Sequence, residues 1–413
     1  MKIAHVITRF IRGGADENTL LTVNAQAEQG HDVVLIHGPE SHEDMFGRLH
    51  TAVETIEIPS LIRDIDLVKD IACLNTLAKE LKRSSPDIVH THTSKAGVIG
   101  RFAARLAEAP VIIHSVHILA FDNVWPGKMF LFQRLEKAAA RYTHGFISVS
   151  EALRKACIDA GVGTEDIHYV VPSGMDVSSY RNAAPADWRS LWPDETRPTR
   201  RPRFVLAVGA LESRKRIAEL IDAFEGVAKS APDAVLMVAG DGPERPRIEK
   251  LIRERNLEGQ VMLLGHVDDL PRYIHLADVC VHVASREGLP RVVLQFAMSG
   301  KPVVATKLPG IEQVVLHEKS GLLCPVDDFD AVRDALERLL GDAELRNRFG
   351  KEAWALDFSG WDTQEMIRSI DDVYRRAILA RQSTGVMRQS MESYARGDTP
   401  RPSGGRSSSR ITG

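Results

Sequence analysis

The sequence predicts an α/β protein built from two doubly wound domains that face each other across a cleft. Short apolar runs rich in β-branched residues alternate with longer helical patterns along most of the 413 residues. This alternation is typical of parallel sheets assembled from β-α-β units. It pauses once, over residues 184–203, where proline, arginine and aspartate replace the apolar pattern. It then resumes, and a chain of this length commonly forms two domains.

The first domain is expected over residues 1–175, followed by a linker at 176–203. Helices are predicted within it at 17–29 and 67–82. Its strands are predicted at 2–8, 32–38, 87–92, 110–117 and 145–150.

The second domain is expected over residues 204–360. A helix at 361–380 is predicted to pack back on the first domain. Residues 381–413 are rich in serine, arginine and glycine, so we expect a disordered tail that cannot offset the entropy of ordering. The strands of the second domain are predicted at 204–211, 234–242, 261–267, 279–285 and 302–310.

Composition narrows the class of protein. Lysine and arginine number 53 against 56 acidic residues, and this net charge of -3 gives no reason to expect a nucleic-acid partner. The four scattered cysteines form no CxxC pair and indicate a reducing compartment. No apolar run approaches the ~20 residues of a membrane helix. We therefore expect a cytoplasmic protein.

Ligands of doubly wound sheets bind beyond the carboxyl ends of the strands, and the first domain has candidates there. Gly13 and Gly14 follow the first strand, where they form either a loop that approaches an anion or sugar, or an ordinary turn. His90 and His92 lie two apart on a strand and share one face. No third ligand is evident, so a metal is not predicted, and cleft-lining or locally hydrogen-bonded histidines are favoured. His117 follows the next strand.

In the second domain, the strand that ends at Gly209 is followed by Arg214 and Lys215 before a helix. Cations at this place suit a phosphate, although a solvated basic turn has the same pattern. Gly242 follows the next strand in a glycine-rich turn, and Val267 follows the third, within reach of a base.

The stretch 285–306 contains one acid, Glu287, at the end of a strand. Gly288, Leu289 and Pro290 follow it and lead into a helix. Glu287 is expected near a helix N-terminus, which favours its charge. Gln295 lies eight residues further on, so both side chains are expected to face one extended ligand.

These motifs resemble those of glycosyltransferase family 4, whose members have the two-domain GT-B fold. The resemblance extends from residue 1 to about 378 and is strongest at 285–306, which is similar to the family's E-x7-E signature. The stretches GGAD, HTHTSKAGVIGRFAAR, SVSEALR and KLPGIEQVV add to it, and HTHTSKAG is similar to enzymes of capsule, exopolysaccharide and lipid-linked glycan synthesis.

The resemblance implies a role for each candidate residue. Glu287 and His117 would act at the reaction centre, with Gly13, Gly14 and His92 on the acceptor and phosphate side. No metal or other cofactor is implied. The donor nucleotide-sugar would be bound by Gly209, Arg214, Lys215, Gly242, Val267, Gly288, Leu289, Pro290, Gln295, Gly310 and Glu312.

Two positions depart from the family pattern. Ala210 stands where an arginine is frequent, and Gln295 stands where a second glutamate usually accepts hydrogen bonds from the ribose. A neutral amide oxygen accepts a weaker hydrogen bond than a carboxylate does, so a lower affinity for the nucleotide is expected. The chemistry at Glu287 is unaffected by this change.

The expected function is retaining transfer of a hexosyl or N-acetylhexosaminyl group from a nucleotide-sugar to an acceptor hydroxyl of a cell-surface polysaccharide or lipid-linked glycan. A UDP-sugar is the expected donor. Two alternatives stay open: a nucleotide-sugar-binding protein with weak or lost catalysis, and a GT-B nucleotide-sugar epimerase. Residues 125–142 combine basic and aromatic side chains, which suits either weak association with an anionic membrane surface or a core-packed helix.

Overall fold

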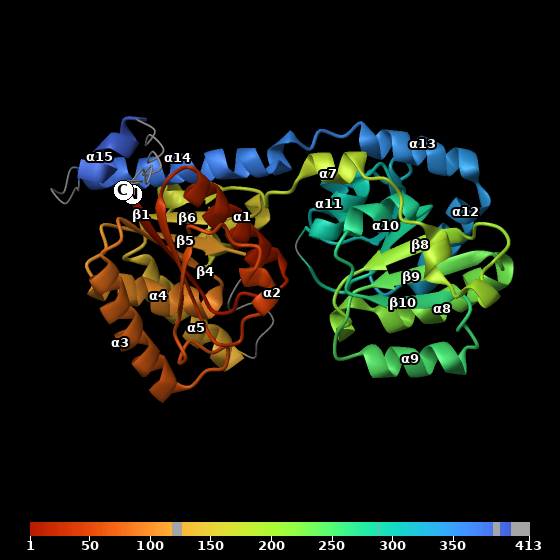
Figure 1. The fold of residues 1–413 in the computed structure, drawn as a ribbon, viewed down its shortest axis with the longest axis horizontal. Helices are drawn as coiled ribbons and strands as arrows, with labels where there is room; N and C mark the ends of the chain where they lie inside the picture. The colour runs from red at the N-terminus through yellow and green to blue at the C-terminus, as the bar shows by residue number, and fades with distance from the viewer. Residues whose placement is uncertain (118–125, 288, 383–388, 398–413) are drawn as a thin grey trace, which may run out of the picture. The chain divides into compact units, whose positions relative to one another are not determined.

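The structure is a computed structural model that describes residues 1–117, 126–287, 289–382 and 389–397 (Figure 1). The chain divides into two compact units. The first consists of Met1–Met175 with Gly360–Gly413, and the second of Asp176–Ser359. Each unit contains one sheet whose described strand pairings are all parallel. The predicted fold class, two doubly wound α/β domains, is therefore confirmed.

The sheet of the first unit has seven strands in the order β3-β2-β1-β4-β5-β6-β7. Apart from the two edge strands, the strand residues are almost all buried, as expected when helices cover both faces of a parallel sheet. The strands are β1 (Lys2–Ile7), β2 (Asp32–His37), β3 (Glu54–Glu57), β4 (Ile88–His92), β5 (Val111–Val116), β6 (Gly145–Ser148) and β7 (His168–Val170).

Helices pack on both faces of this sheet (Figure 1). On one face, α14 (Thr363–Gln382) packs against β1, β4, β5 and β6 in a single apolar cluster. On the other face, α3 (Leu67–Ser84) and α4 (Ser94–Leu106) pack against β1, β2, β4 and β5. The remaining helices of the unit are α1 (Gly14–Glu28), α2 (Glu43–Phe46), α5 (Pro126–Ala140), α6 (Glu151–Asp159) and α15 (Gln389–Ala395).

The second unit contains a six-stranded sheet in the order β10-β9-β8-β11-β12-β13. Its main core joins the strands to α8, α9 and α12. The strands are β8 (Arg203–Val208), β9 (Ala234–Ala239), β10 (Val261–Gly265), β11 (Val279–His282), β12 (Val303–Thr306) and β13 (Gly321–Cys324). The helices are α7 (Val177–Asn182), α8 (Ile217–Ser230), α9 (Arg245–Glu254), α10 (Leu270–Leu276), α11 (Arg291–Met298), α12 (Phe329–Gly341) and α13 (Ala343–Trp354).

Both strand orders place a topological switch point beside the first strand of each sheet. In the first unit the chain adds β2 and β3 on one side of β1 and then crosses to β4 on the other side. In the second unit the same reversal lies between β8 and β11. Doubly wound sheets bind ligands outside the carboxyl ends of the strands at such points. The sequence candidates that follow β1, β4, β8 and β11 therefore lie at the expected edges.

The structure differs from the sequence expectations at the 176–203 segment. Instead of a linker outside both domains, this segment belongs to the second unit and forms α7 and two short 3-10 helices, Trp188–Leu191 and Asp194–Thr196. Its Trp192 lies against Phe204 of β8, with ring centroids 6.2 Å apart. This aromatic contact comes from tertiary packing and leaves no periodic pattern in the sequence.

The expectation of a disordered tail from residue 381 is wrong for residues 389–395, which form α15. Met391 is fully buried and Tyr394 is 7% exposed. The Tyr394 hydroxyl donates a hydrogen bond to Asp371 of α14 over 3.0 Å, and its ring faces His31. Two apolar side chains in a polar segment were too few to reveal this docking, because their partners lie on other elements.

Truncation at two points tests the packing of α15. We expect a chain that ends at Gln382 to lose about 2 kcal/mol of unfolding free energy, because Met391 and Tyr394 no longer bury apolar surface. Its melting temperature should fall by about 5 °C. A chain that ends at Gly397 keeps both side chains and should melt like the full-length protein. Equal melting temperatures for the two truncated chains would show that α15 does not pack in solution.

Among the described residues, the helices are all too short or too polar to cross a lipid bilayer.

Candidate functional site

The loops that follow β8 and β11 are joined at the switch point of the second sheet. The loop after β8 contains a short 3-10 helix, Ser213–Lys215, and the loop after β11 contains Glu287. The Ser285 backbone N–H donates to the Arg214 carbonyl over 2.9 Å, and the Ser285 hydroxyl contacts the same oxygen at 3.3 Å. The basic turn and the acidic loop, which lie far apart in sequence, thus form one site.

Glu287 is the centre of this site, and its side chain is 12% exposed. Its Oε1 atom contacts Nη1 of Arg214 at 2.5 Å and also pairs with the ammonium group of Lys215. Its Oε2 atom lies 3.3 Å from Nε2 of His282, the last residue of β11. Three candidates from the sequence are brought together here, and His282 joins them.

The electrostatics of the cluster keep Glu287 ionised. Burial alone would raise the pKa of Glu287, but the His282 contact and the charge of Lys215 outweigh burial and hold that pKa well below its usual range. Burial also lowers the pKa of His282, so its imidazole is neutral at neutral pH. Glu287 therefore lies against two cations, of which Arg214 also pairs with Glu212 at 2.8 Å. These two cations suit an anionic ligand such as a diphosphate.

His282 was missed in the sequence. A histidine inside an apolar strand has the pattern of an ordinary core residue, and only its position as the last residue of β11 gave a signal.

Other predicted donor residues follow β8, β9 and β10 in the second unit. Gly209 follows β8, and the Lys215 side chain passes 3.5 Å from the point where a Cβ atom of residue 209 would stand. A Cβ atom on Gly242 would lie 2.6 Å from the Leu211 carbonyl oxygen, so a larger residue would displace the backbone there. Val267 is half-buried just after β10.

The loop after β12 lies one strand further along the sheet edge. Gly310 has φ of 84°, a conformation that favours glycine, and it begins the 3-10 helix Ile311–Gln313. Glu312 is largely exposed and pairs with Lys307 at 2.9 Å. In this structure Glu312 therefore contacts a surface lysine, separately from the Glu287 cluster.

The helix α11 follows the Glu287 loop. Leu289 is half-buried, Pro290 is the residue that precedes the helix, and Gly288 lies outside the described residues. Gln295 lies on the second turn and is half-buried. Its side chain makes no hydrogen bond to another described residue, so the amide group is available to a ligand.

The first unit places Gly13 and Gly14 at the start of α1, immediately after the loop that leaves β1. Beside them Asp16, in the first turn of α1, is 8% exposed and accepts a hydrogen bond from the Ile11 backbone N–H at 3.2 Å. Burial raises the pKa of Asp16 to about 6. This buried carboxylate was also missed in the sequence, because only the two glycines of the GGAD motif were treated as candidates.

His92 ends β4, and His117 follows β5. Their rings are stacked with centroids 5.9 Å apart, so these two candidates lie together. His5, His90 and His92 bring nitrogen atoms within 4.8 Å of one another, as a metal site would. However, both nitrogens of His5, both of His90 and one of His92 already contact protein partners. A metal would have to replace these contacts.

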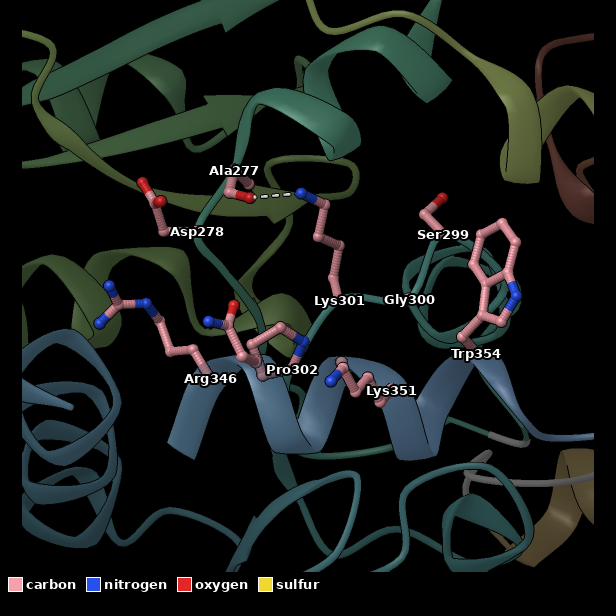
Figure 2. A pocket seen from close by; sticks show the side chains of 11 residues that line it. Ala277, Asp278, Ser299, Gly300, Lys301, Pro302, Arg346, Lys351 and Trp354 are labelled. Carbon is pink, nitrogen blue, oxygen red and sulfur yellow. Dashed lines mark hydrogen bonds between the residues drawn. The ribbon is translucent and has the colours of Figure 1, made fainter. Parts of the chain in front are cut away.

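A pocket of about 510 Å³ in the second unit lies at the opposite edge of the sheet, before β11 and β12 (Figure 2). Two of its cations, Lys301 and Arg346, are already paired with backbone oxygens. The Lys301 ammonium group donates to the carbonyls of His275 and Ala277 at 2.8 Å, and Arg346 donates to those of Leu339 and Leu340. The Lys301 contacts join the end of α10 to the segment before β12, and the Arg346 contacts join α13 to the end of α12, which indicates a structural role.

Comparison with known proteins agrees with the geometry of the two units. The profile described as Glycosyltransferase Family 4 matches residues 12–179, and the profile described as Glycosyl transferases group 1 matches residues 189–355. The chain belongs to the family 4 glycosyltransferases. Its resemblance at 285–306 therefore reflects a shared fold and a shared class of enzyme, and the expectation of a glycosyltransferase is confirmed.

Several known members of this enzyme class are similar over most of the chain. One is the UDP-Gal:alpha-D-GlcNAc-diphosphoundecaprenol alpha-1,3-galactosyltransferase of Escherichia coli, 29% identical over 91% of this chain and 96% of that protein. Another is the capsular polysaccharide biosynthesis glycosyltransferase CapM of Staphylococcus aureus, 27% identical over 72% of this chain and 78% of its own length. Anabaena HepE in complex with UDP-glucose has a TM-score of 0.73 at 21% identity, covering 90% of this chain and 98% of HepE. That structure supports the fold.

The substitution Gln295→Glu tests the position that departs from the family pattern. A carboxylate accepts from both ribose hydroxyls, whereas the amide oxygen of Gln295 accepts beside its own NH₂ group. We expect the variant to bind UDP about five-fold more tightly, equivalent to about 1 kcal/mol, in isothermal titration calorimetry. Weaker binding than the wild type would mean that the NH₂ group of Gln295 itself donates to the ligand.

Proposed function

We propose that this glycosyltransferase transfers a hexosyl or N-acetylhexosaminyl group, with retention of configuration, from a UDP-sugar to a hydroxyl of a cell-surface polysaccharide or lipid-linked glycan. The observation that supports this most directly is the ionised Glu287 held between Lys215, Arg214 and His282 at the β8–β11 switch point. The E. coli relative is named for a UDP-sugar and a diphosphoundecaprenol-linked acceptor, which supports the same classes of substrate here.

The cluster suits a reaction in which charge separates. The bond between the anomeric carbon and the diphosphate oxygen breaks, and its electrons stay on the diphosphate. The acceptor oxygen forms the new bond on the same face of the sugar, and its proton passes to the departing diphosphate oxygen. Lys215 and Arg214 offset the negative charge that develops on the diphosphate.

Glu287 supplies the opposite charge. Because its pKa is held low, Glu287 has no proton to donate and acts as a fixed carboxylate. A fixed negative charge stabilises the positive charge that develops on the sugar ring in the transition state. His282 positions this carboxylate from the end of β11.

A transfer assay with purified protein tests the proposal. UDP-galactose, UDP-glucose and UDP-N-acetylglucosamine are offered with a short-chain N-acetylglucosamine-diphospholipid, and the product's anomeric configuration is read by NMR. An alpha-linked product from one of these donors is the expected result. A beta-linked product would refute retention.

Two other outcomes would favour the alternatives. Release of free sugar or an epimer without any acceptor indicates an epimerase, and donor binding without turnover indicates a binding protein. The variant Glu258→Gln, changed at an exposed residue in the turn before β10, is the matched control for substitutions at Glu287.

Transfer is also expected to proceed without a metal ion. The charge of Lys215 and Arg214 lies at the site where the diphosphate would bind, and it takes the place that a divalent cation has in other transferases. The initial rate should be unchanged after treatment with EDTA. A rate that collapses in EDTA and returns on addition of magnesium or manganese would overturn this expectation.

We further propose that α5 brings the enzyme to the membrane surface on which a lipid-linked acceptor is held. Phe130 is 61% exposed and Leu131 is 49% exposed, and the Arg134 guanidinium lies 5.0 Å from the Phe130 ring centroid. Exposed apolar side chains beside a cation suit anionic headgroups. Phe132 instead packs against the core, so it does not contribute to this surface.

Liposome flotation tests the membrane proposal. Trp125 and the side chain of Met129, which also belonged to the expected surface, lie outside the described residues. Vesicles with anionic lipid should float the wild type, and Phe130→Glu should weaken this association. Equal flotation with purely neutral vesicles, or no effect of Phe130→Glu, would count against α5 as the contact.

A further inference from the structure

A chain of buried side chains crosses the β1–β4 switch point of the first unit. His5 on β1 lies opposite His90 on β4 in the strand register, and His92 ends β4. His5 is fully buried and His92 is 2% exposed. The Nδ1 atom of His5 lies 2.9 Å from Nε2 of His92, and the Nε2 atom of His5 lies 2.8 Å from Oε1 of Gln26 on α1. The three side chains thus form a continuous line, Gln26–His5–His92.

Each of these imidazoles is neutral. Burial lowers the pKa of His5 to about 4 and the pKa of His92 well below its ordinary value. A neutral imidazole has one N–H donor and one lone-pair acceptor. Each imidazole in the line therefore donates at one nitrogen and accepts at the other. The group at one end of the line determines which nitrogen is the donor.

Gln26 is the group that determines it. Its NH₂ group donates to the Tyr374 hydroxyl oxygen at 3.3 Å, so its carbonyl oxygen faces His5. That oxygen can only accept, which places the His5 proton on Nε2 and leaves a lone pair on Nδ1. His92 must then donate from Nε2 to His5, and its own Nδ1 atom has a lone pair. This Nδ1 atom is buried and has no hydrogen-bond partner in the described part of the chain.

The backbone next to His92 shows a second unusual feature. Thr93 has φ of 60° and ψ of 172°, a region that β-branched residues rarely occupy. Its hydroxyl lies 3.1 Å from that of Thr8, which also accepts from the Ala96 N–H at the start of α4. Strain that the surrounding contacts hold in place is frequent at ligand sites. It occurs here at the switch-point edge, where doubly wound sheets bind ligands.

We propose that Nδ1 of His92 accepts a hydrogen bond from a hydroxyl group of a carbohydrate substrate, and that Gln26, acting through His5, fixes the tautomer that makes this possible. The inference rests on the proposed function. The ligand must be a donor, because the unpaired group on His92 is a lone pair, and sugar hydroxyls are donors. The hydroxyl belongs to the acceptor glycan or to the transferred sugar. His92 is the binding group, while Gln26 and His5 are positioning residues.

Two amide substitutions distinguish the role of Nδ1 of His92 from the role of its Nε2. In His92→Asn, the side-chain amide stands near the place of Nδ1 and can still accept from a hydroxyl, but the contact with His5 is lost. In His92→Gln, the amide reaches the place of Nε2 and keeps the contact with His5, but the acceptor at Nδ1 is lost. We expect His92→Gln to raise the KM of one carbohydrate substrate about tenfold, the size of one hydrogen bond. His92→Asn should raise it less.

Measuring KM separately for the acceptor and for the UDP-sugar identifies the molecule that carries the hydroxyl. A rise in KM for the acceptor alone assigns it to the glycan, and a rise for the UDP-sugar with unchanged UDP affinity assigns it to the transferred sugar. If His92→Gln leaves both values unchanged, or if His92→Asn is the more damaging variant, the histidine has a structural role and the proposal is wrong.

Nitrogen NMR of ¹⁵N-histidine-labelled wild-type protein gives a test that does not depend on variants or turnover. Near neutral pH, the His92 signal should show a protonated Nε2 and an unprotonated Nδ1. The opposite tautomer, or stoichiometric zinc on these histidines, would overturn the inference even if the enzyme is active. A protein that shows the expected tautomer but transfers no sugar would instead refute the proposed function.

Discussion

Replacing Glu287 with glutamine is expected to lower kcat by about 10²-fold or more while UDP still binds. Glutamine has the shape of glutamate but no charge, so the change removes the negative charge beside the reacting sugar. Lys215 and Arg214 lose this counter-ion, while Arg214 keeps its contact with Glu212, and both cations stay available for the diphosphate. The loss should therefore appear in kcat, with the Kd of UDP unchanged or lowered.

The measurement combines initial rates with calorimetry of UDP binding. Circular dichroism establishes that Glu287→Gln is folded, and Glu258→Gln, at an exposed turn away from the cluster, controls for the loss of one charge. Turnover within a few-fold of the wild type would show that Glu287 does not act in the transition state. A large loss of UDP affinity with normal kcat would assign it to donor binding alone.

The sequence predicted the central strands of both sheets well, for a physical reason. Strands such as β1 and β8 are covered on both faces, so they are near-continuous apolar runs bounded by polar turns. The edge strand β3 has the sequence ETIE and is mostly exposed, so it has no such run and was not predicted. The three-residue strand β7 was too short to recognise.

The candidate site was predictable in part. Lys215, Arg214 and Glu287 each follow a strand of the same sheet, and parallel strands bring their carboxyl ends to one edge. No sequence pattern indicated that all three residues contact one another, because side-chain pairing depends on loop conformation. His5 and His282 were missed because a histidine within an apolar strand has the pattern of a core residue.

Replacing Asp16 with asparagine is expected to stabilise the first unit near neutral pH. Asp16 is 8% exposed, and burial raises its pKa from 3.8 to about 6. A raised carboxyl pKa means that folding penalises the charged form. The penalty is absent below about pH 4, where the acid is protonated in both states, and it is complete above about pH 6. Stability should therefore fall as pH rises between these values.

The size of the effect follows from the pKa difference. At about 1.4 kcal/mol for each pKa unit, the penalty at neutral pH is at most about 3 kcal/mol. Asparagine carries no charge, and its side-chain oxygen can still accept from the Ile11 N–H. Calorimetric unfolding of the wild type and Asp16→Asn should give nearly equal stability at acidic pH and a gap that widens toward neutral pH. A gap that stays constant across pH would mean that Asp16 is not the titrating group. A widening gap would show that the chain retains, beside the Gly13–Gly14 loop, a carboxylate that ionises near neutral pH at a cost to its own stability.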